Sequence, residues 1–474
     1  MVFSSIVFLL YFLPLFLACY YLVGKAYKNL VILAFSIFFY SWGAPKFIFV
    51  ILGTTLLDFH LVKWMDASKE AWRRNVFLVL SLSINLGLLL YFKYSNFFIE
   101  NLNGLLHLFG SGTIHWTKLL LPIGISFYTF ETITYVVDVY RRVHKPLDHF
   151  WDYQTYIILF PKLIAGPIIR YHELADQIKD RSAFDTYENR LSGFYRFTIG
   201  LSKKVLLANP LGAIADPIFQ GDYNVLSSPT AWLGILCYTF QIYFDFSGYS
   251  DMAIGIGKMI GFRFPENFDN PYTSKSITEF WRRWHITLGN WMRNYLYIPL
   301  GGNRVSSQSR LYFNLWLVFL ASGLWHGASW SFILWGAYHG LFLVLERSFL
   351  NRFYTYIGKW PSVLCCFFIV LIGWVFFRIE HISDAFLFLS RMFAFDTIKN
   401  IDFQFDYFFY IFLAFIFSWF TLSNYGNHIQ QAIYFQNFSN RMHVGMLSLT
   451  LLLFAVCIAM ISSSGFNPFI YFRF

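Results

Sequence analysis

Charged side chains are scarce in this sequence: only 13% of its 474 residues are Asp, Glu, Lys or Arg, which is about half the share found in soluble proteins. Hydrophobic residues make up 57% of the chain and aromatic residues 22%. Apolar runs recur along the whole length, and a helix of about 20 such residues crosses a bilayer. The composition therefore excludes an ordinary water-soluble fold and predicts an all-α polytopic membrane protein.

Signatures of several other protein classes are missing. The five cysteines lie in apolar segments without the spacing of metal ligands, so we expect neither a disulfide framework nor a metal site. No Gly-x-Ser-x-Gly elbow is present for a serine hydrolase. The glycines at 255–257 and 301–304 complete neither a dinucleotide-binding loop nor a P-loop. Residues 76–92 are apolar on every face, which favours a helix over a barrel strand.

Basic residues outnumber acidic residues, 36 to 26, which gives a net charge of +10. In a soluble protein this charge would suggest nucleic acid, but here the basic residues gather in short loops at Lys25 and Lys28, at 63–74 and at 141–145, as in cytoplasmic loops. We expect about 11–13 crossings, with the N-terminus outside and residues 3–23 retained as the first helix. Counting the spans from that end places these basic loops inside. We therefore expect no nucleic-acid partner. The predicted spans are 3–23, 29–42, 47–62, 76–92, 119–139, 190–208, 230–246, 311–345 (two helices), 361–377, 405–423 and 444–462.

Two segments interrupt this series of spans. Residues 150–170 are apolar but contain two prolines and embedded basic residues, and residues 247–304 are amphipathic and rich in Arg, Trp, Asn and Gly. Irregular backbone at membrane depth needs protein or a water-filled cavity to satisfy its polar groups, so we expect residues 150–170 to be re-entrant or interfacial. Residues 247–304 could lie in the interface or line a cavity. No internal repeat or linker is visible, and we assign residues 1–474 to a single transmembrane domain, with a core at 120–345 and C-terminal helices and an outer tail at 361–474.

Two histidines lie where an ionisable group is costly. His285 ends the stretch Phe-Trp-Arg-Arg-Trp-His, and His326 lies in a long apolar stretch, flanked by small residues that allow close approach of another helix or of a substrate. An ionisable side chain inside a membrane is a candidate for function. The alternative is a structural histidine hydrogen-bonded to a neighbouring helix, and both interpretations also apply to His339 and His60.

Five short motifs occur in a fixed order over about residues 120–345. They are PKLIAGP at 161–167, DFSGYSD at 245–251, FDNPY at 268–272, FWRRWH at 280–285 and WHG at 325–327. Together they resemble the membrane-bound O-acyltransferase (MBOAT) family, in particular the bacterial branch of alginate and peptidoglycan O-acetyltransferase membrane subunits. The C-terminal segment 467–474 also resembles the tail of that branch, although Arg473 stands where Gln is expected.

The resemblance implies the MBOAT fold, with the 11–13 helices in a ring around a central tunnel. It implies a multi-pass protein of the bacterial inner membrane that passes an acetyl group from cytoplasmic acetyl-CoA, a substrate and not a bound cofactor, toward an extracytoplasmic polysaccharide such as peptidoglycan or an alginate-like polymer. The family's catalytic histidine corresponds to His326 and its second histidine to His285. The implied partners are membrane lipid and a periplasmic or membrane-anchored acetyltransferase of the SGNH type, through which the polysaccharide is reached indirectly.

The remaining candidate residues follow from this expected reaction. Tyr471 in the tail is a candidate acyl relay toward the partner, and the alternative for it is an aromatic belt at the membrane interface. A secondary transporter or a non-catalytic export subunit would also accommodate buried histidines, although no repeat pairs the two halves of the chain as in many transporters. Expected donor-binding residues are Arg282, Arg283, Arg293 and Arg304, and expected tunnel-lining residues are Trp325, Asp245, Ser247 and Asn290.

Overall fold

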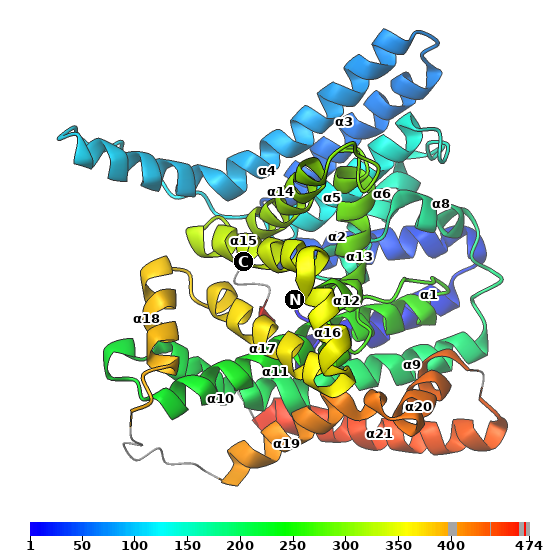
Figure 1. Ribbon diagram of the computed structural model, residues 1–474. Coiled ribbons are helices and arrows are strands. Elements are labelled where there is room, and N and C mark those ends of the chain that lie inside the picture. The colour runs from blue at the N-terminus through cyan, green and yellow to red at the C-terminus, as the bar shows by residue number, and fades with distance from the viewer. Residues whose placement is uncertain (397–404, 437, 464–468, 471–474) are drawn as a thin grey trace. The chain divides into compact units, whose positions relative to one another are not determined.

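The computed structural model describes all residues except 397–404, 437, 464–468 and 471–474. The described residues form helices and connecting loops without a β-strand (Figure 1). By contact they divide into two compact units, one of Met1–Arg190 with Gly257–Phe264 and one of Leu191–Ile256 with Pro265–Phe474. The all-helical prediction is confirmed, whereas the assignment to a single domain remains a prediction.

The first unit contains the helices of the N-terminal predicted spans. The helix expected over 119–139 begins only at Ile125, because Pro122 and Gly124, whose φ is +76°, end an irregular stretch. The helix expected over 76–92 is longer than predicted. The helices are α1 (Leu13–Leu22, after a π-helical stretch Val7–Phe12), α2 (Lys28–Gly43), α3 (Ile48–Ala67), α4 (Ala71–Leu108), α5 (Ile125–Tyr140), α6 (Phe150–Ile158), α7 (Phe160–Leu163) and α8 (Tyr171–Lys179).

The irregular segment 150–170 lies inside this first unit. Its helix breaks at Leu159, between α6 and α7, so that the ring of Phe160 enters a cluster of phenylalanines, with its centroid 5.0 Å from that of Phe16. Lys162 is fully buried and forms an ion pair with the buried Glu131 of α5. The embedded lysine is thus neutralised by protein, which is how a broken helix in an apolar setting is tolerated.

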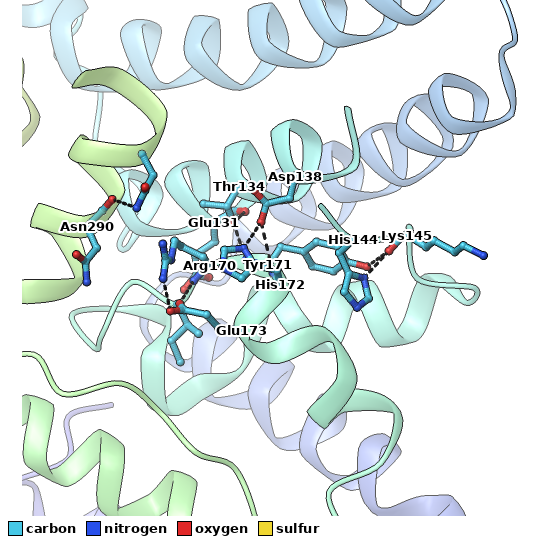
Figure 2. Close-up of polar contacts among 12 residues, drawn as sticks. Glu131, Thr134, Asp138, His144, Lys145, Arg170, Tyr171, His172, Glu173 and Asn290 are labelled. Atoms are coloured by element: carbon cyan, nitrogen blue, oxygen red, sulfur yellow. Dashed lines mark hydrogen bonds and ion pairs between the residues drawn. The ribbon is translucent and has the colours of Figure 1, made fainter. Parts of the chain in front are cut away.

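Side chains of α5 hold the start of α8, where the segment ends (Figure 2). The hydroxyl of Thr134 accepts a hydrogen bond from the backbone N–H of Tyr171 at 3.0 Å, and a carboxylate oxygen of Asp138 lies 2.7 Å from Nδ1 of His172. Glu173 accepts from the backbone N–H of Arg170 at 3.0 Å, which satisfies a donor at the helix N-terminus. The end of the segment is therefore anchored by specific polar contacts.

The three predicted cytoplasmic loops meet at one end of the first unit. The side chain of Asn29, next to the loop with Lys25 and Lys28, donates to Asp152 at 3.3 Å. Lys63, in the loop 63–74, binds four residues earlier, at Asp148. Met1, Gly43 and Ile123, all expected on the opposite side, approach one another at the other end. The structure thus confirms that the basic loops share one side. The contacts that join them to other inner segments are Lys28 with Asp185, Lys63 Nζ to Asp148 O at 2.7 Å, and Arg74 Nη2 to Tyr140 O at 2.8 Å.

The second unit contains the remaining helices, apart from two helix turns that fall in the first unit. The helix predicted over 230–246 continues to Met259, so the first part of the segment 247–304 belongs to this long helix. The helices are α9 (Tyr187–Ser202, whose first turn falls in the first unit), the π-helix η3 (Lys203–Ala208), α10 (Asn209–Gln220), α11 (Ser228–Met259, whose last turn falls in the first unit), α12 (Ile277–Arg283), α13 (Ile286–Met292), α14 (Gln308–His326), α15 (Trp330–Leu345), the π-helix η7 (Glu346–Leu350), α16 (Asn351–Ile357), α17 (Lys359–Arg378), α18 (Ile382–Met392), α19 (Phe405–Trp419), α20 (Asn424–Phe435) and α21 (Asn440–Ser463).

Close backbone contact explains why α11 continues beyond its predicted end. A Cβ atom on Gly248 would lie 2.7 Å from the carbonyl oxygen of Gly200 in α9, and one on Gly200 would lie 2.5 Å from the carbonyl oxygen of Gly248. The two glycines therefore permit α9 and α11 to touch along their backbones. The polar residues that directly follow position 246, which suggested an interface or the lining of a cavity, are buried inside the protein, and Asp251 among them lines a cavity.

Five helical segments are long and apolar enough to cross a membrane, counted over the described residues only. The shorter apolar stretch Val7–Leu22 resembles them in composition. The predicted pair of helices at 311–345 is confirmed as α14 and α15. The protein is thus a multi-pass membrane protein, and the number of 11–13 crossings remains a prediction. The five segments are Ile48–Ala67, Ala71–Leu108, Lys359–Arg378, Phe405–Leu422 and Asn440–Ser463.

Candidate functional site

His326 is the last residue of α14, at the tight turn into α15. A Cβ atom on Gly323 would lie 2.3 Å from the carbonyl oxygen of Phe332, so the expectation that small residues near His326 allow a close helix approach is confirmed. The imidazole is 4% exposed and is surrounded by aromatic rings. Its ring centroid lies 5.1 Å from that of Trp335 and 5.1 Å from that of Phe377. The close approach of α14 and α15 at Gly323 therefore leaves the imidazole of His326 enclosed by aromatic rings.

His285 lies between α12 and α13 and is 2% exposed. Its backbone is in the left-handed region, with φ 45° and ψ 52°, which is uncommon for a residue other than glycine and costs of order 1 kcal/mol. Such conformations persist where surrounding contacts hold them. Here the backbone N–H of Ile286, the next residue, donates to the carbonyl oxygen of Asn267 at 2.9 Å.

The side chain of Asn267 determines which nitrogen of His285 carries the proton. Its Oδ1 accepts from the backbone N–H of Thr287 at 3.3 Å and lies 3.1 Å from Nδ1 of His285. Because an amide oxygen only accepts, Nδ1 must be the protonated nitrogen of the neutral ring. Nε2 of His285 is then the unprotonated nitrogen, and it has no hydrogen-bond partner among the residues that the structure describes.

Trp325 connects the two histidines. Its ring centroid lies 6.1 Å from that of His285 and 4.9 Å from that of His326. The structure thus brings together three candidates that are up to 41 positions apart in the sequence, 285 to 326. His285 and His326, which we call the histidine pair, form the centre of the candidate site together with Trp325.

The two predicted residues of α11 lie beside this centre. Phe246 stands between them in the sequence, and its ring centroid lies 4.7 Å from that of His285. Asp245 forms an ion pair with Lys204 at 2.6 Å. The buried hydroxyl of Ser247 has no hydrogen-bond partner among the described residues. Phe246 thus contacts His285, Asp245 and Ser247 flank it in the sequence, and the role of these two residues as tunnel lining remains a prediction.

The C-terminal tail enters the same region of the second unit. The backbone N–H of Ile470 donates to Asp245 at 2.7 Å, and the ring of Phe469 lies 4.8 Å from that of Tyr249 and 5.9 Å from that of Phe246. Both tail residues are buried. Tyr471 itself lies outside the described residues, but the residues just before it reach the aromatic contacts of His285.

The four arginines expected to bind the donor differ from one another. Arg283 is half-buried and forms ion pairs with Glu279 at 2.9 Å and Asp269 at 3.3 Å, so its charge is already balanced. The side chains of the other three are exposed and form no ion pair among the described residues; they are Arg282, Arg293 and Arg304. These three are the better candidates for phosphate contacts.

Asn290 and the two weaker histidine candidates differ in their surroundings. Asn290 is half-buried in α13, and its carbonyl oxygen accepts from the side chain of Asn294 at 2.7 Å (Figure 2). His60 is exposed on α3 in the first unit. His339 is fully buried, neither of its ring nitrogens has a partner among the described residues, and its ring lies 5.2 Å from that of Trp335.

Two functional contacts were not predicted from the sequence. Asn267 directly precedes the FDNPY motif, and this adjacency is the one signal in the sequence that points to it. Phe246 lies in the DFSGYSD motif, between Asp245 and Ser247, and no pattern in the sequence singles out its ring. Both matter because they contact His285, at distances that no local pattern encodes.

A mostly apolar cavity of about 380 Å³ also lies in the second unit. Phe268 and Asn270 of the FDNPY motif line it, together with apolar side chains of α19, α20 and α21. Its basic residues Arg196 and Lys203 both form ion pairs with Asp251, at 2.7 Å each. Asp251 therefore neutralises two cations beside the cavity.

Comparisons with known proteins agree with the resemblance. The family model described as membrane-bound O-acyltransferase matches residues 141–380. The chain is 46% identical over 402 residues to the probable alginate O-acetylase AlgI of Pseudomonas aeruginosa, covering 84% of this chain and 76% of that protein. It is 36% identical over 425 residues to the peptidoglycan O-acetyltransferase of Helicobacter pylori (83% and 80%), and 26% identical over 269 residues to the teichoic acid D-alanyltransferase of Bacillus subtilis (52% and 65%).

The matched region contains the five motifs and both members of the histidine pair. The family assignment replaces the transporter and export-subunit alternatives, because the relatives named above are transferases. This chain belongs to the membrane-bound O-acyltransferase family, in the branch of the alginate and peptidoglycan O-acetyltransferases, and is an acyltransferase.

Proposed function

We propose that this protein passes an acetyl group from cytoplasmic acetyl-CoA across the bacterial inner membrane for O-acetylation of an extracytoplasmic polysaccharide, either peptidoglycan or an alginate-like polymer. The names of its relatives support acyl transfer to a cell-envelope polymer. The observation that carries the proposal is the histidine pair, two buried imidazoles joined by Trp325, one of which presents an unpartnered ring nitrogen.

The reaction needs a base for the acceptor hydroxyl. In the proposed step, the hydroxyl oxygen attacks the thioester carbonyl carbon while its proton moves to a ring nitrogen of neutral His326. The carbon–sulfur bond then breaks, and the departing thiolate takes that proton. A positioned general base contributes about 10²- to 10⁴-fold to the rate.

The contact with Asn267 restricts what His285 does in this reaction. With Nδ1–H donating to Asn267, Nε2 of the neutral ring only accepts a hydrogen bond. It therefore does not donate to a developing oxyanion, which is one of the roles that a second histidine commonly has. We assign His285 to accepting a hydrogen bond from the acceptor hydroxyl or from an amide N–H of the donor's pantetheine arm, so that it orients the substrate.

We assign binding of the donor to exposed arginines and the next carrier step to the C-terminal tail. The exposed Arg282, Arg293 and Arg304 would meet the phosphates of acetyl-CoA at the inner mouth. Tyr471 would then carry the acetyl group toward an SGNH-type partner outside, and the burial of Phe469 and Ile470 next to Phe246 supports a tail that reaches the site. A tail that serves only as an interface belt would have no need of the contact between Ile470 and Asp245.

The test measures transfer of labelled acetyl from acetyl-CoA, with release of free thiol, by the purified protein in lipid vesicles. His326→Ala should lower the rate by about 10²-fold or more. His60→Ala is the matched control, since it removes an exposed histidine from the other unit and should leave the rate unchanged. A correctly inserted His326→Ala protein with full transfer would refute the assigned base. Intact-mass measurement with donor alone should show one acetyl group in the tail that Tyr471→Phe abolishes.

A further inference from the structure

A second pocket, of about 260 Å³, lies in the first unit, at the end where the predicted cytoplasmic loops meet. It is formed where the turn between α1 and α2 faces residues 178–190, from the end of α8 to the first turn of α9. Five basic side chains and two acidic ones line it, so positive charge is in excess. The lining is Tyr20, Lys25, Lys28, Asn29, Ile178, Lys179, Asp180, Arg181, Ser182, Asp185 and Arg190.

Arg181 is the unusual member of this pocket. It is only 8% exposed, yet its hydrogen bonds go to neutral acceptors alone, namely the side-chain oxygen of Asn29 at 2.7 Å, the carbonyl oxygen of Ile260 at 3.1 Å and the hydroxyl of Tyr20 at 3.3 Å. Its Nη2 has no partner among the described residues, and no carboxylate there pairs with it. Burying a charge without a counter-charge is costly, so this guanidinium is set up for an anion that the protein itself does not supply.

The acidic residues of the pocket are already engaged elsewhere. Asp185 forms ion pairs with both Lys28 and Arg190. Burial alone would raise the pKa of the Asp185 carboxyl, but its hydrogen bonds with these two cations outweigh burial and lower that pKa below its ordinary value. Asp180 accepts from the backbone N–H of Ser182 at 2.9 Å. Neither carboxylate is therefore available to Arg181.

The surroundings of the pocket suit the membrane surface. Next to the pocket, Leu22 is 86% exposed and Tyr27 is 63% exposed, so apolar side chains flank the turn that carries Lys25 and Lys28. Apolar residues beside basic ones are typical of a segment at the boundary between acyl chains and headgroups. The cytoplasmic leaflet is also where anionic lipids accumulate.

We propose that this pocket binds a phosphate ester at the cytoplasmic face, with Arg181 as the central cation and Lys25 at the rim. A guanidinium matches the oxygens of a phosphate in a paired geometry. The same chemistry is offered by the headgroup of an anionic phospholipid and by a soluble nucleotide phosphate. The site lies within the first unit and is independent of the acyl-transfer chemistry assigned to the histidine pair.

The experiment uses the full-length protein in two forms. Native mass spectrometry after exchange into detergent with phosphatidylglycerol or phosphatidylcholine measures retained lipid. Titration with adenosine 3′,5′-bisphosphate, in nanodiscs of phosphatidylcholine only, measures a soluble phosphate. The variants are Arg181→Gln and, because that change could disturb the contacts with Asn29 and Ile260, the exposed Lys25→Glu. Arg73→Gln is the control, as an exposed cation of another inner loop that pairs with Glu70.

Selective retention of phosphatidylglycerol, weakened about fivefold or more by both pocket variants and unchanged in Arg73→Gln, identifies a lipid headgroup site. Saturable binding of the bisphosphate with the same pattern of variants identifies a soluble phosphate site. Binding of neither probe, or binding that is equal in both pocket variants and the wild type, overturns the proposal. Equal loss in Arg73→Gln also overturns it, since that result shows only general attraction to a basic surface.

Discussion

Removing the amide oxygen of Asn267 should impair the function of His285 although His285 itself is unchanged. Asn267→Ala deletes the acceptor for Nδ1–H of His285 and for the backbone and hydroxyl donors of Thr287, at 3.1, 3.3 and 2.8 Å. A hydrogen bond of this kind contributes about 0.5–1.5 kcal/mol net, so losing the preferred tautomer alone should slow transfer by about 2- to 10-fold. The ring also loses its restraint, and a misplacement of about 1 Å costs up to roughly 10²-fold.

We therefore expect Asn267→Ala to lower kcat by about 10- to 100-fold. Asn267→Asp keeps an acceptor oxygen toward Nδ1 and should recover most of this loss. The assay is the initial rate of acetyl transfer in vesicles, with KM and kcat determined separately and thermal unfolding measured on the same samples.

The control for this experiment is Ser250→Ala. Ser250 accepts from the side-chain nitrogen of Asn267 at 3.0 Å, so this change removes the other contact of Asn267 and leaves its oxygen on His285. The reasoning is refuted if Asn267→Ala retains full kcat in a folded protein. It is equally refuted if Ser250→Ala loses as much activity as Asn267→Ala, because the effect would then be general loosening of the site.

Two further changes test how helices position the site. Gly323→Ala should strongly destabilise the α14–α15 hairpin, because the added methyl group would lie 2.3 Å from the backbone oxygen of Phe332. We expect a clear drop in the thermal unfolding temperature together with lost transfer. An unchanged melting curve would contradict the close contact. Glu346→Gln should cost about 1–3 kcal/mol of stability and reduce transfer. The buried carboxylate accepts from the backbone N–H groups of Ile277 and Thr278 at the start of α12, and the NH₂ group of Gln would face one of these donors with another donor. Chemical denaturation in detergent measures the stability, and equal stability of variant and wild type would refute the prediction.

Much of the architecture could be predicted because it depends on local composition. Apolar runs produce helices in a membrane since only internal hydrogen bonds satisfy the backbone there, and the glycines beside His326 predicted the close pair α14 and α15. The shared side of the basic loops also followed from charge alone. The end of α11 could not be predicted, because its polar residues after position 246 are buried by contact with Gly200, which is distant in the sequence.

The sequence by itself determined the helical membrane class, the family motifs and the two histidines, since all of these are properties of neighbouring residues. Only the tertiary structure decided that Asn267, 18 positions before His285, selects its protonated nitrogen, and that Asp245 holds the backbone of Ile470 from 225 positions away. It likewise decided that Arg283 is neutralised while Arg181 is not. Hydrogen bonds and ion pairs are formed between atoms that meet only when the chain is packed, so no local pattern contains them.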